Sequence, residues 1–242
     1  VADGLACGNG NGCHQGVCKW AVDIAAGAHH SCALRPDGKV QCWGRNLVGQ
    51  VGNGSFGGTV LAPAAVVDAS NGIALSANGH TTCLLQKSGT VQCWGAGDSC
   101  QTGGSVGDQA KAVTVAGLGN VGVIAVGASH ACAMDKTTSE VRCWGSNTKG
   151  EVGDNKPGAQ AVCAPSLALG VKPTTVKVGR LALGSGFGLA SHDIGYGYFW
   201  GRNDSKQLTG QWPQSAIAQP AVLSMTPWLW VTAGGAFACA LG

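Results

Sequence analysis

The chain repeats one pattern of apolar and polar residues four times. Each copy is an apolar strand that ends in Gly, then a Cys or its replacement, a tight turn and a Trp-Gly step. The clearest copies span 27–44, 78–95 and 127–145, and a degenerate copy spans 184–201. No apolar period of 3.6 residues is sustained within them, so the pattern predicts strands and no helix longer than about three turns.

The Trp-Gly steps set the period of this pattern. Their tryptophans, Trp43, Trp94, Trp144 and Trp200, lie 51, 50 and 56 residues apart. A period near 50 residues that is rich in glycine and β-branched residues is typical of a β-propeller with one four-stranded blade per repeat. We therefore expect an all-β fold with blades near 21–69, 70–121, 122–176 and 177–227. The tryptophans should pack between blades, and the following glycines should lie at a bend or bulge.

The two ends of the chain resemble the two halves of one repeat. Residues 233–241 match 26–34, and residues 3–10 resemble 37–44. Propellers commonly close by building one blade from both termini, which removes the open sheet edge. The sequence thus predicts a single domain over 1–242, a five-bladed β-propeller. Its Cys-rich segment 1–20 contributes to a last blade closed by both termini.

Six of the twelve cysteines recur at hairpin spacing. Each pair flanks a turn, so its members should face each other on neighbouring antiparallel strands, within reach of a disulfide. The short knuckle of structural zinc sites is missing from these pairs. We expect the intra-blade disulfides Cys32–Cys42, Cys83–Cys93 and Cys132–Cys143.

The other six cysteines lie outside this repeated spacing, so the sequence gives weaker evidence for their pairing. Cys7–Cys239 is the bridge expected to close the ring, with Cys18 as the second choice of partner, and Cys13–Cys18 and Cys100–Cys163 complete the set. Alternatively, Cys7, Cys13 and Cys18 belong to a separate Cys-rich module. This number of disulfides indicates an oxidising compartment, and hence a secreted, extracellular protein.

The amino-acid composition of the chain argues against nucleic acid and membrane as partners. The 242 residues are 45% hydrophobic and 11% charged with a net charge of +3, which is unlike a disordered chain. Lys and Arg are scattered singly, so nucleic-acid binding has little support. No apolar stretch approaches the roughly 18 residues that a membrane span needs, so we expect no membrane insertion.

The repeats resemble a known family. The phrase Gly-x-x-His-x-Cys-Ala-Leu, followed by Asp-Gly-x-Val-x-Cys-Trp-Gly-x-Asn and Gly-Gln-x-Gly, is similar to the regulator-of-chromosome-condensation repeat, in the Cys-bearing version found in bacterial secreted proteins. The resemblance covers about 21–242, although its members usually have seven blades. It implies a binding surface rather than a reaction. The eukaryotic founder acts on a small nuclear GTPase, which fits a disulfide-rich chain poorly, and a secreted bacterial relative inhibits β-lactamases.

No catalytic constellation is apparent. Ser191, His192 and Asp193 are adjacent, and neighbours on a strand point to opposite faces, so they form no triad. His30 and His130 share a repeat position, beside His29 and with His80 one residue out of step. They could bind a metal, but we interpret them as structural residues that hydrogen-bond within their own blades. We expect no enzyme activity, no metal and no cofactor.

Aromatic residues outside the period are the candidate contacts for a ligand. Exposed aromatics away from repeat positions tend to be contact residues in sugar- or protein-binding surfaces. Arg45 and Arg202, which follow Trp-Gly steps, join them. The candidate binding residues are Trp20, Arg45, Phe56, Arg202, Trp212, Trp228 and Trp230. The alternative for these aromatics is that they plug the ring or seal the closing blade.

Three functions fit these observations. The first is a protein-interaction or inhibitor module, and the second is a lectin for extracellular glycans. The third is a structural subunit of an extracellular assembly. Because the inter-repeat loops differ in length and chemistry, we favour a single asymmetric face for an extracellular protein partner.

Overall fold

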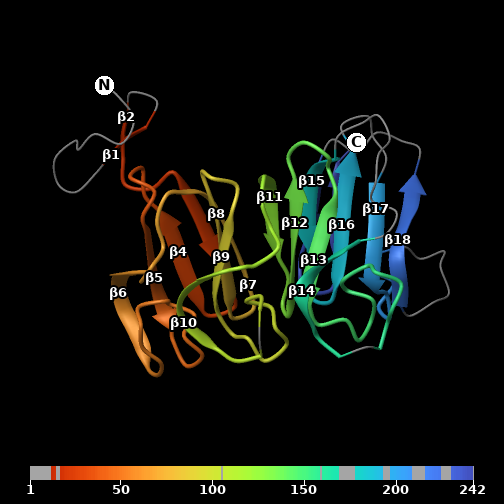
Figure 1. The fold of residues 1–242 in the computed structure, drawn as a ribbon, viewed down its shortest axis with the longest axis horizontal. Helices are drawn as coiled ribbons and strands as arrows, with labels where there is room; N and C mark the ends of the chain where they lie inside the picture. The colour runs from red at the N-terminus through yellow and green to blue at the C-terminus, as the bar shows by residue number, and fades with distance from the viewer. Residues whose placement is uncertain are drawn as a thin grey trace.

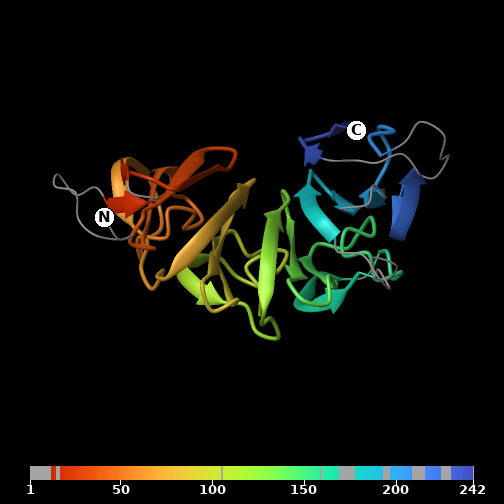
Figure 2. The ribbon, with the colours of Figure 1, turned by 90° about the horizontal axis from the view of Figure 1, so that it is seen from above.

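A computed structural model describes residues 12–14, 17–104, 106–158, 160–168, 178–192, 197–208, 216–224 and 230–241. It is an all-β fold in which four antiparallel blades of four strands each stand side by side along an arc (Figures 1 and 2). The four blades coincide with the four repeats predicted from the Trp-Gly period. The described part of the chain contains no helix with the length and hydropathy needed to cross a membrane.

The strands of each blade follow one another in chain order. Blade 1 contains β3 (Asp23–Ala26), β4 (His30–Leu34), β5 (Val40–Arg45) and β6 (Thr59–Ala65). Blade 2 contains β7 (Gly72–Asn78), β8 (Thr81–Gln86), β9 (Val91–Gly95) and β10 (Gln109–Thr114). Blade 3 contains β11 (Val121–Val126), β12 (His130–Asp135), β13 (Val141–Gly145) and β14 (Val162–Leu167). Blade 4 contains β15 (Val178–Leu183), β16 (Phe187–His192), β17 (Gly197–Arg202) and β18 (Ala216–Ser224).

The predicted hairpin disulfides are confirmed. Cys32 faces Cys42, Cys83 faces Cys93, and Cys132 faces Cys143 in the strand register, each with a Cα–Cα distance of 4.1 Å. A separation this short is expected for directly opposed residues of a non-hydrogen-bonded pair. The predicted Cys100–Cys163 bridge is also present, and it ties a loop of blade 2 to β14 of blade 3.

The glycine of each Trp-Gly step lies at a β-bulge, as predicted. The pairing of the third and fourth strands shifts register next to Gly44, Gly145 and Gly201. Gly44 has a φ of +109°, and a Cβ there would lie 2.6 Å from the carbonyl oxygen of His29. Only glycine fits this combination of left-handed backbone and close approach.

The hydrophobic core lies between blades rather than within one. One cluster joins blades 1 and 2 around Trp94, a second joins blades 2 and 3 around Trp144, and a third joins blades 3 and 4 around Trp200. These three tryptophans are fully buried. The prediction that they pack between blades is therefore confirmed.

The two ends of the described chain form separate hairpins. β19 (Trp230–Ala233) pairs with β20 (Ala238–Leu241), as predicted for this segment, and β19 packs on blade 4. At the other end, β1 (Gly12–His14) pairs with β2 (Val17–Lys19), which sets the backbone of Cys13 opposite Cys18. The side chains of these two cysteines are outside the described residues.

A closing blade shared by both termini is not formed by the described residues. The hairpins β1–β2 and β19–β20 are separate two-stranded sheets. β1–β2 lies at the blade-1 end of the arc (Figure 1), whereas β19–β20 packs on blade 4. Cys239 is exposed and bonded to no described cysteine, and no strand of the described chain pairs with the outer edge of β20, so the predicted Cys7–Cys239 bridge stays a prediction. Cys7 lies outside the described residues. The structure therefore shows four complete blades and half of another, and it does not establish the predicted total of five.

Candidate partner-binding site

A long loop follows each Trp-Gly step, and in blades 1, 3 and 4 a buried asparagine fixes its shape. In blade 1 the side-chain oxygen of Asn46 accepts the backbone N–H of Val51 at 2.9 Å, and its amide donates to the carbonyl of Ser55 at 2.9 Å. Asn147 and Asn203 accept the equivalent N–H groups in blades 3 and 4. Because these hydrogen bonds form within the loop itself, each of these loops is held rigid and presents its exposed side chains in fixed positions.

The same loops join the blades. The indole N–H of Trp94 donates to the carbonyl of Gln50 at 3.1 Å, that of Trp144 to Gln101 at 2.9 Å, and that of Trp200 to Glu151 at 2.8 Å. In every case a tryptophan of one blade binds the loop of the preceding blade. The position of each loop is therefore set by the interface beneath it.

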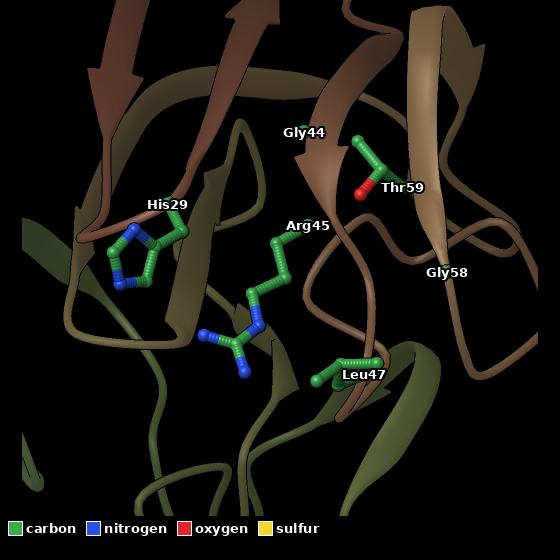
Figure 3. A pocket seen from close by; sticks show the side chains of 6 residues that line it. All are labelled: His29, Gly44, Arg45, Leu47, Gly58 and Thr59. Atoms are coloured by element: carbon green, nitrogen blue, oxygen red, sulfur yellow. The ribbon is translucent and has the colours of Figure 1, made fainter.

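Blade 1 carries an open pocket on this rim, which we call the blade-1 pocket. It has a volume of about 420 Å³ and is lined by His29, Gly44, Arg45, Leu47, Gly58 and Thr59. Figure 3 shows the Arg45 side chain pointing into the space between His29 and Leu47. The loop over 46–58 forms its outer wall and also carries Phe56. Leu47, which lines the pocket with Arg45, is 50% exposed, and Phe56, elsewhere on the same loop, is 57% exposed.

The residues that line the blade-1 pocket are positively charged or neutral. The backbone N–H of Arg45 donates to the carbonyl of His29 at 2.8 Å. The His29 ring stacks on His80 of blade 2, with 5.7 Å between ring centroids. Partial burial, His29 and Arg45 together lower the pKa of His80, and Asp98 opposes them. Within the described ranges no carboxylate forms an ion pair with Arg45. The pocket is therefore suited to a negatively charged group.

A second pocket occupies the equivalent place between blades 3 and 4, and we call it the blade-3/4 pocket. Its volume is about 390 Å³, and its lining residues are Ser129, Ser146, Thr148, Lys149, Glu151, Ser185, Gly186, Arg202 and Asp204. Here the Nε of Arg202 donates to both carboxylate oxygens of Asp204 at 2.7 Å. This hydrogen bonding lowers the pKa of the Asp204 carboxyl. Unlike Arg45, Arg202 already holds a carboxylate.

The structure brings together only some of the predicted binding residues. Arg45 lines the blade-1 pocket, Phe56 lies in its loop, and Arg202 lines the blade-3/4 pocket. Trp20 instead packs at a tilt against Trp43, with ring centroids 6.2 Å apart. Trp230 is half-exposed on β19, where the Arg180 guanidinium lies 3.7 Å from its ring centroid. Trp212 and Trp228 lie outside the described residues.

The repeat histidines are structural, but not in the way predicted. His30 is buried, and its Nε2 hydrogen-bonds Thr82 Oγ1 of the next blade at 2.7 Å rather than a group of its own blade. Burial lowers the pKa of both His30 and His130 to about 4, so both are neutral at pH 7. No three His, Cys, Asp or Glu side chains gather as a possible metal site in the part of the chain that is described.

Sequence reasoning missed two of the residues that shape the blade-1 pocket, Leu47 and His80. A comparison of repeats would have found Leu47, because Arg45-Asn-Leu47 stands where blade 4 has Arg202-Asn-Asp204. His80 was noted only as a histidine out of step. Its stacking on His29 depends on how neighbouring blades pack, which the repeat pattern does not specify.

The family comparison agrees with this architecture. A model of the regulator of chromosome condensation (RCC1) repeat matches residues 21–50 and 124–151. The human E3 ubiquitin-protein ligase HERC2 is 29% identical over 215 residues, which cover 84% of this chain and 4% of HERC2.

Two solved structures show the same fold. Yeast RCC1 (Prp20), crystallised with Kap60, has a TM-score of 0.80 at 23% identity, covering 92% of this chain and 54% of the yeast chain. Human WBSCR16 has a TM-score of 0.79 at 21% identity, covering 91% of this chain and 57% of the human chain. The chain thus spans little more than half the length of either protein. Residues 21–50 and 124–151 thus match the RCC1 repeat, and the chain folds as an RCC1-type β-propeller.

Proposed function

We propose that this chain is an extracellular protein-binding module that acts by binding rather than by catalysis. RCC1-type propellers are protein-interaction modules, and yeast RCC1 is bound to Kap60 in its crystal structure. The disulfides within three blades, and the fourth that joins two blades, support an oxidising and hence extracellular location. An inhibitor-like role for the module belongs to the same proposal.

One observation carries the choice of surface. Leu47 is exposed in the pocket with Arg45, which forms no ion pair with the described residues, and Phe56 is exposed on the same loop, which Asn46 holds in place. Apolar and arginine side chains on a preorganised loop favour a protein partner, because little conformational entropy is lost on binding. The two pockets share repeat positions but not residue types, which disfavours a glycan site repeated in every blade.

A pull-down from the extracellular fraction of the source organism tests this proposal. The bait proteins are the wild-type chain, a double variant Leu47→Ser/Phe56→Ser and the control Ile73→Ser. Ile73 is a suitable control because it is 53% exposed but lies near the start of β7, whereas His80, which stacks on the pocket residue His29, follows the other end of that strand. We expect a partner that the wild type and the control capture and the double variant loses, and whose binding is reproduced with purified components. Equal capture by all three baits would contradict the proposed surface.

A further inference from the structure

Arg45 and Arg202 occupy the same position of their repeats. Each follows a Trp-Gly step, and its backbone N–H donates to the turn before the second strand of its blade. Arg45 donates to His29 at 2.8 Å, and Arg202 donates to Gly186 at 2.7 Å. The next residue is a buried asparagine in both blades. The two arginines therefore start from the same backbone geometry.

The residue two positions later differs between these blades. In blade 4 it is Asp204, whose two carboxylate oxygens both lie 2.7 Å from the Arg202 Nε. In blade 1 it is Leu47, which cannot neutralise a guanidinium. Blade 4 thus shows how this repeat position binds a carboxylate, and blade 1 has the arginine without its acid.

The space around Arg45 remains open and attracts negative charge. The blade-1 pocket has room for a side chain, about 420 Å³, and Arg45 points into it (Figure 3). His29 lines the pocket, and its ring stacks on that of His80 in blade 2. Asp98, the nearby acid that acts on His80, accepts a hydrogen bond from the Gln101 amide at 2.7 Å.

We propose that the blade-1 pocket binds a carboxylate side chain from an acidic peptide segment of a partner protein, with Arg45 as its ligand. The carboxylate takes the place that Asp204 has in blade 4, and an apolar neighbour in the peptide packs on Leu47 and Phe56. Leu47 is the reason to expect a peptide, since a small inorganic anion would gain little from an apolar wall. This inference rests on the proposed function and names the chemistry of its partner.

Two capped dipeptides test the proposal by NMR titration of the full chain. The probes are acetyl-Glu-Leu-amide and its uncharged analogue acetyl-Gln-Leu-amide. We expect the Glu peptide to shift the imidazole resonances of His29 and His80 in a saturable way. It should also raise the pKa of His80, since a bound carboxylate counters the repulsion from Arg45 and His29. Equal responses to the two peptides would overturn the proposal.

Substitutions at Leu47 and Arg45 test the geometry. In Leu47→Asp the chain supplies its own carboxylate, as blade 4 does, and we expect the Glu peptide to bind about fivefold more weakly. Leu47→Asn is the matched uncharged control and should keep the preference for Glu over Gln. Arg45→Gln should abolish that preference without changing the melting temperature. Unchanged Glu-peptide binding by both Leu47→Asp and Arg45→Gln would refute the proposal.

The failure of this inference can be separated from failure of the proposed function. If the Arg45→Gln bait captures the same partner as the wild type, the binding surface stands and the carboxylate assignment falls. If the Glu peptide binds through Arg45 but no protein is captured through Leu47 and Phe56, the carboxylate site stands and the protein-binding proposal falls.

Discussion

Replacing the interface tryptophans one at a time tests how the blades are joined. In Trp144→Phe the phenyl ring keeps most of the buried contact but removes the N–H that donates to the carbonyl of Gln101 at 2.9 Å. Trp94→Phe and Trp200→Phe make the same change at the two neighbouring interfaces. Trp43→Phe is the matched control, since Trp43 occupies the same repeat position but is only half-buried, with no described blade before it.

The size of the expected loss in unfolding free energy follows from how deeply the tryptophan and its acceptor are buried. Trp144 and Gln101 are almost completely buried, at 0% and 2% exposure, so water does not replace the lost donor. A buried acceptor left without its partner costs about 1–3 kcal/mol. The volume lost with the pyrrole ring adds about 1 kcal/mol. We expect each interface substitution to lower the free energy of unfolding by about 2–4 kcal/mol, and Trp43→Phe to lower it by less than about 1 kcal/mol.

Urea denaturation followed by far-ultraviolet circular dichroism measures these changes without relying on tryptophan fluorescence. In a chain of this size, thermal scans should show a fall of about 2–4 °C in Tm for each kcal/mol lost. The argument would be refuted if Trp43→Phe were as destabilising as the other three. A loss below about 0.5 kcal/mol in all four variants would refute it equally.

Two further predictions concern the disulfides and acid stability. The Cys100–Cys163 bridge spans 63 residues, and the Cys32–Cys42 bridge spans 10. Replacing both cysteines of a bridge by Ala should lower the free energy of unfolding, measured by urea denaturation, by about 4 kcal/mol for the first bridge and about 3 kcal/mol for the second. A loss below 1 kcal/mol for the longer link would contradict this. Burial lowers the pKa of His130 to about 4, so the unfolded chain binds its proton first as the pH falls from 6.5 to 4. This histidine alone should lower the free energy of unfolding by about 3 kcal/mol across that window, and His30 adds to the drop. His130→Phe should lessen this drop, and an unchanged pH profile would count against the assignment.

The repeat architecture could be predicted because its determinants are local. A tight turn between two cysteines sets the register of a hairpin, and this placed Cys32 opposite Cys42. The period of the Trp-Gly steps placed the blades, and a glycine was the only residue to suit the bulge at position 44. Each of these constraints acts within one repeat, so a single sequence contains it.

The features that were missed depend on contacts between repeats. The hydrogen bond of His30 goes to Thr82 of the next blade, although a bond within its own blade was expected. Arg45 was identified as a candidate, but its lack of an acid partner appears only when Leu47 is compared with Asp204. The closing blade expected from the similar half-repeats at the two ends stays a prediction, because residues 1–11 lie outside the described residues.

The loop after each Trp-Gly step separates its structural positions from its exposed ones. Asn46 and Gln50 face inward and hold the loop and the next blade, whereas Arg45, Leu47 and Phe56 point outward. A library that randomises positions 45, 47 and 56 would therefore change the chemistry of the surface without disturbing its support. Because blades 3 and 4 hold their loops with Asn147 and Asn203 in the same way, each could be diversified separately, and the chain would serve as a scaffold for selected binders.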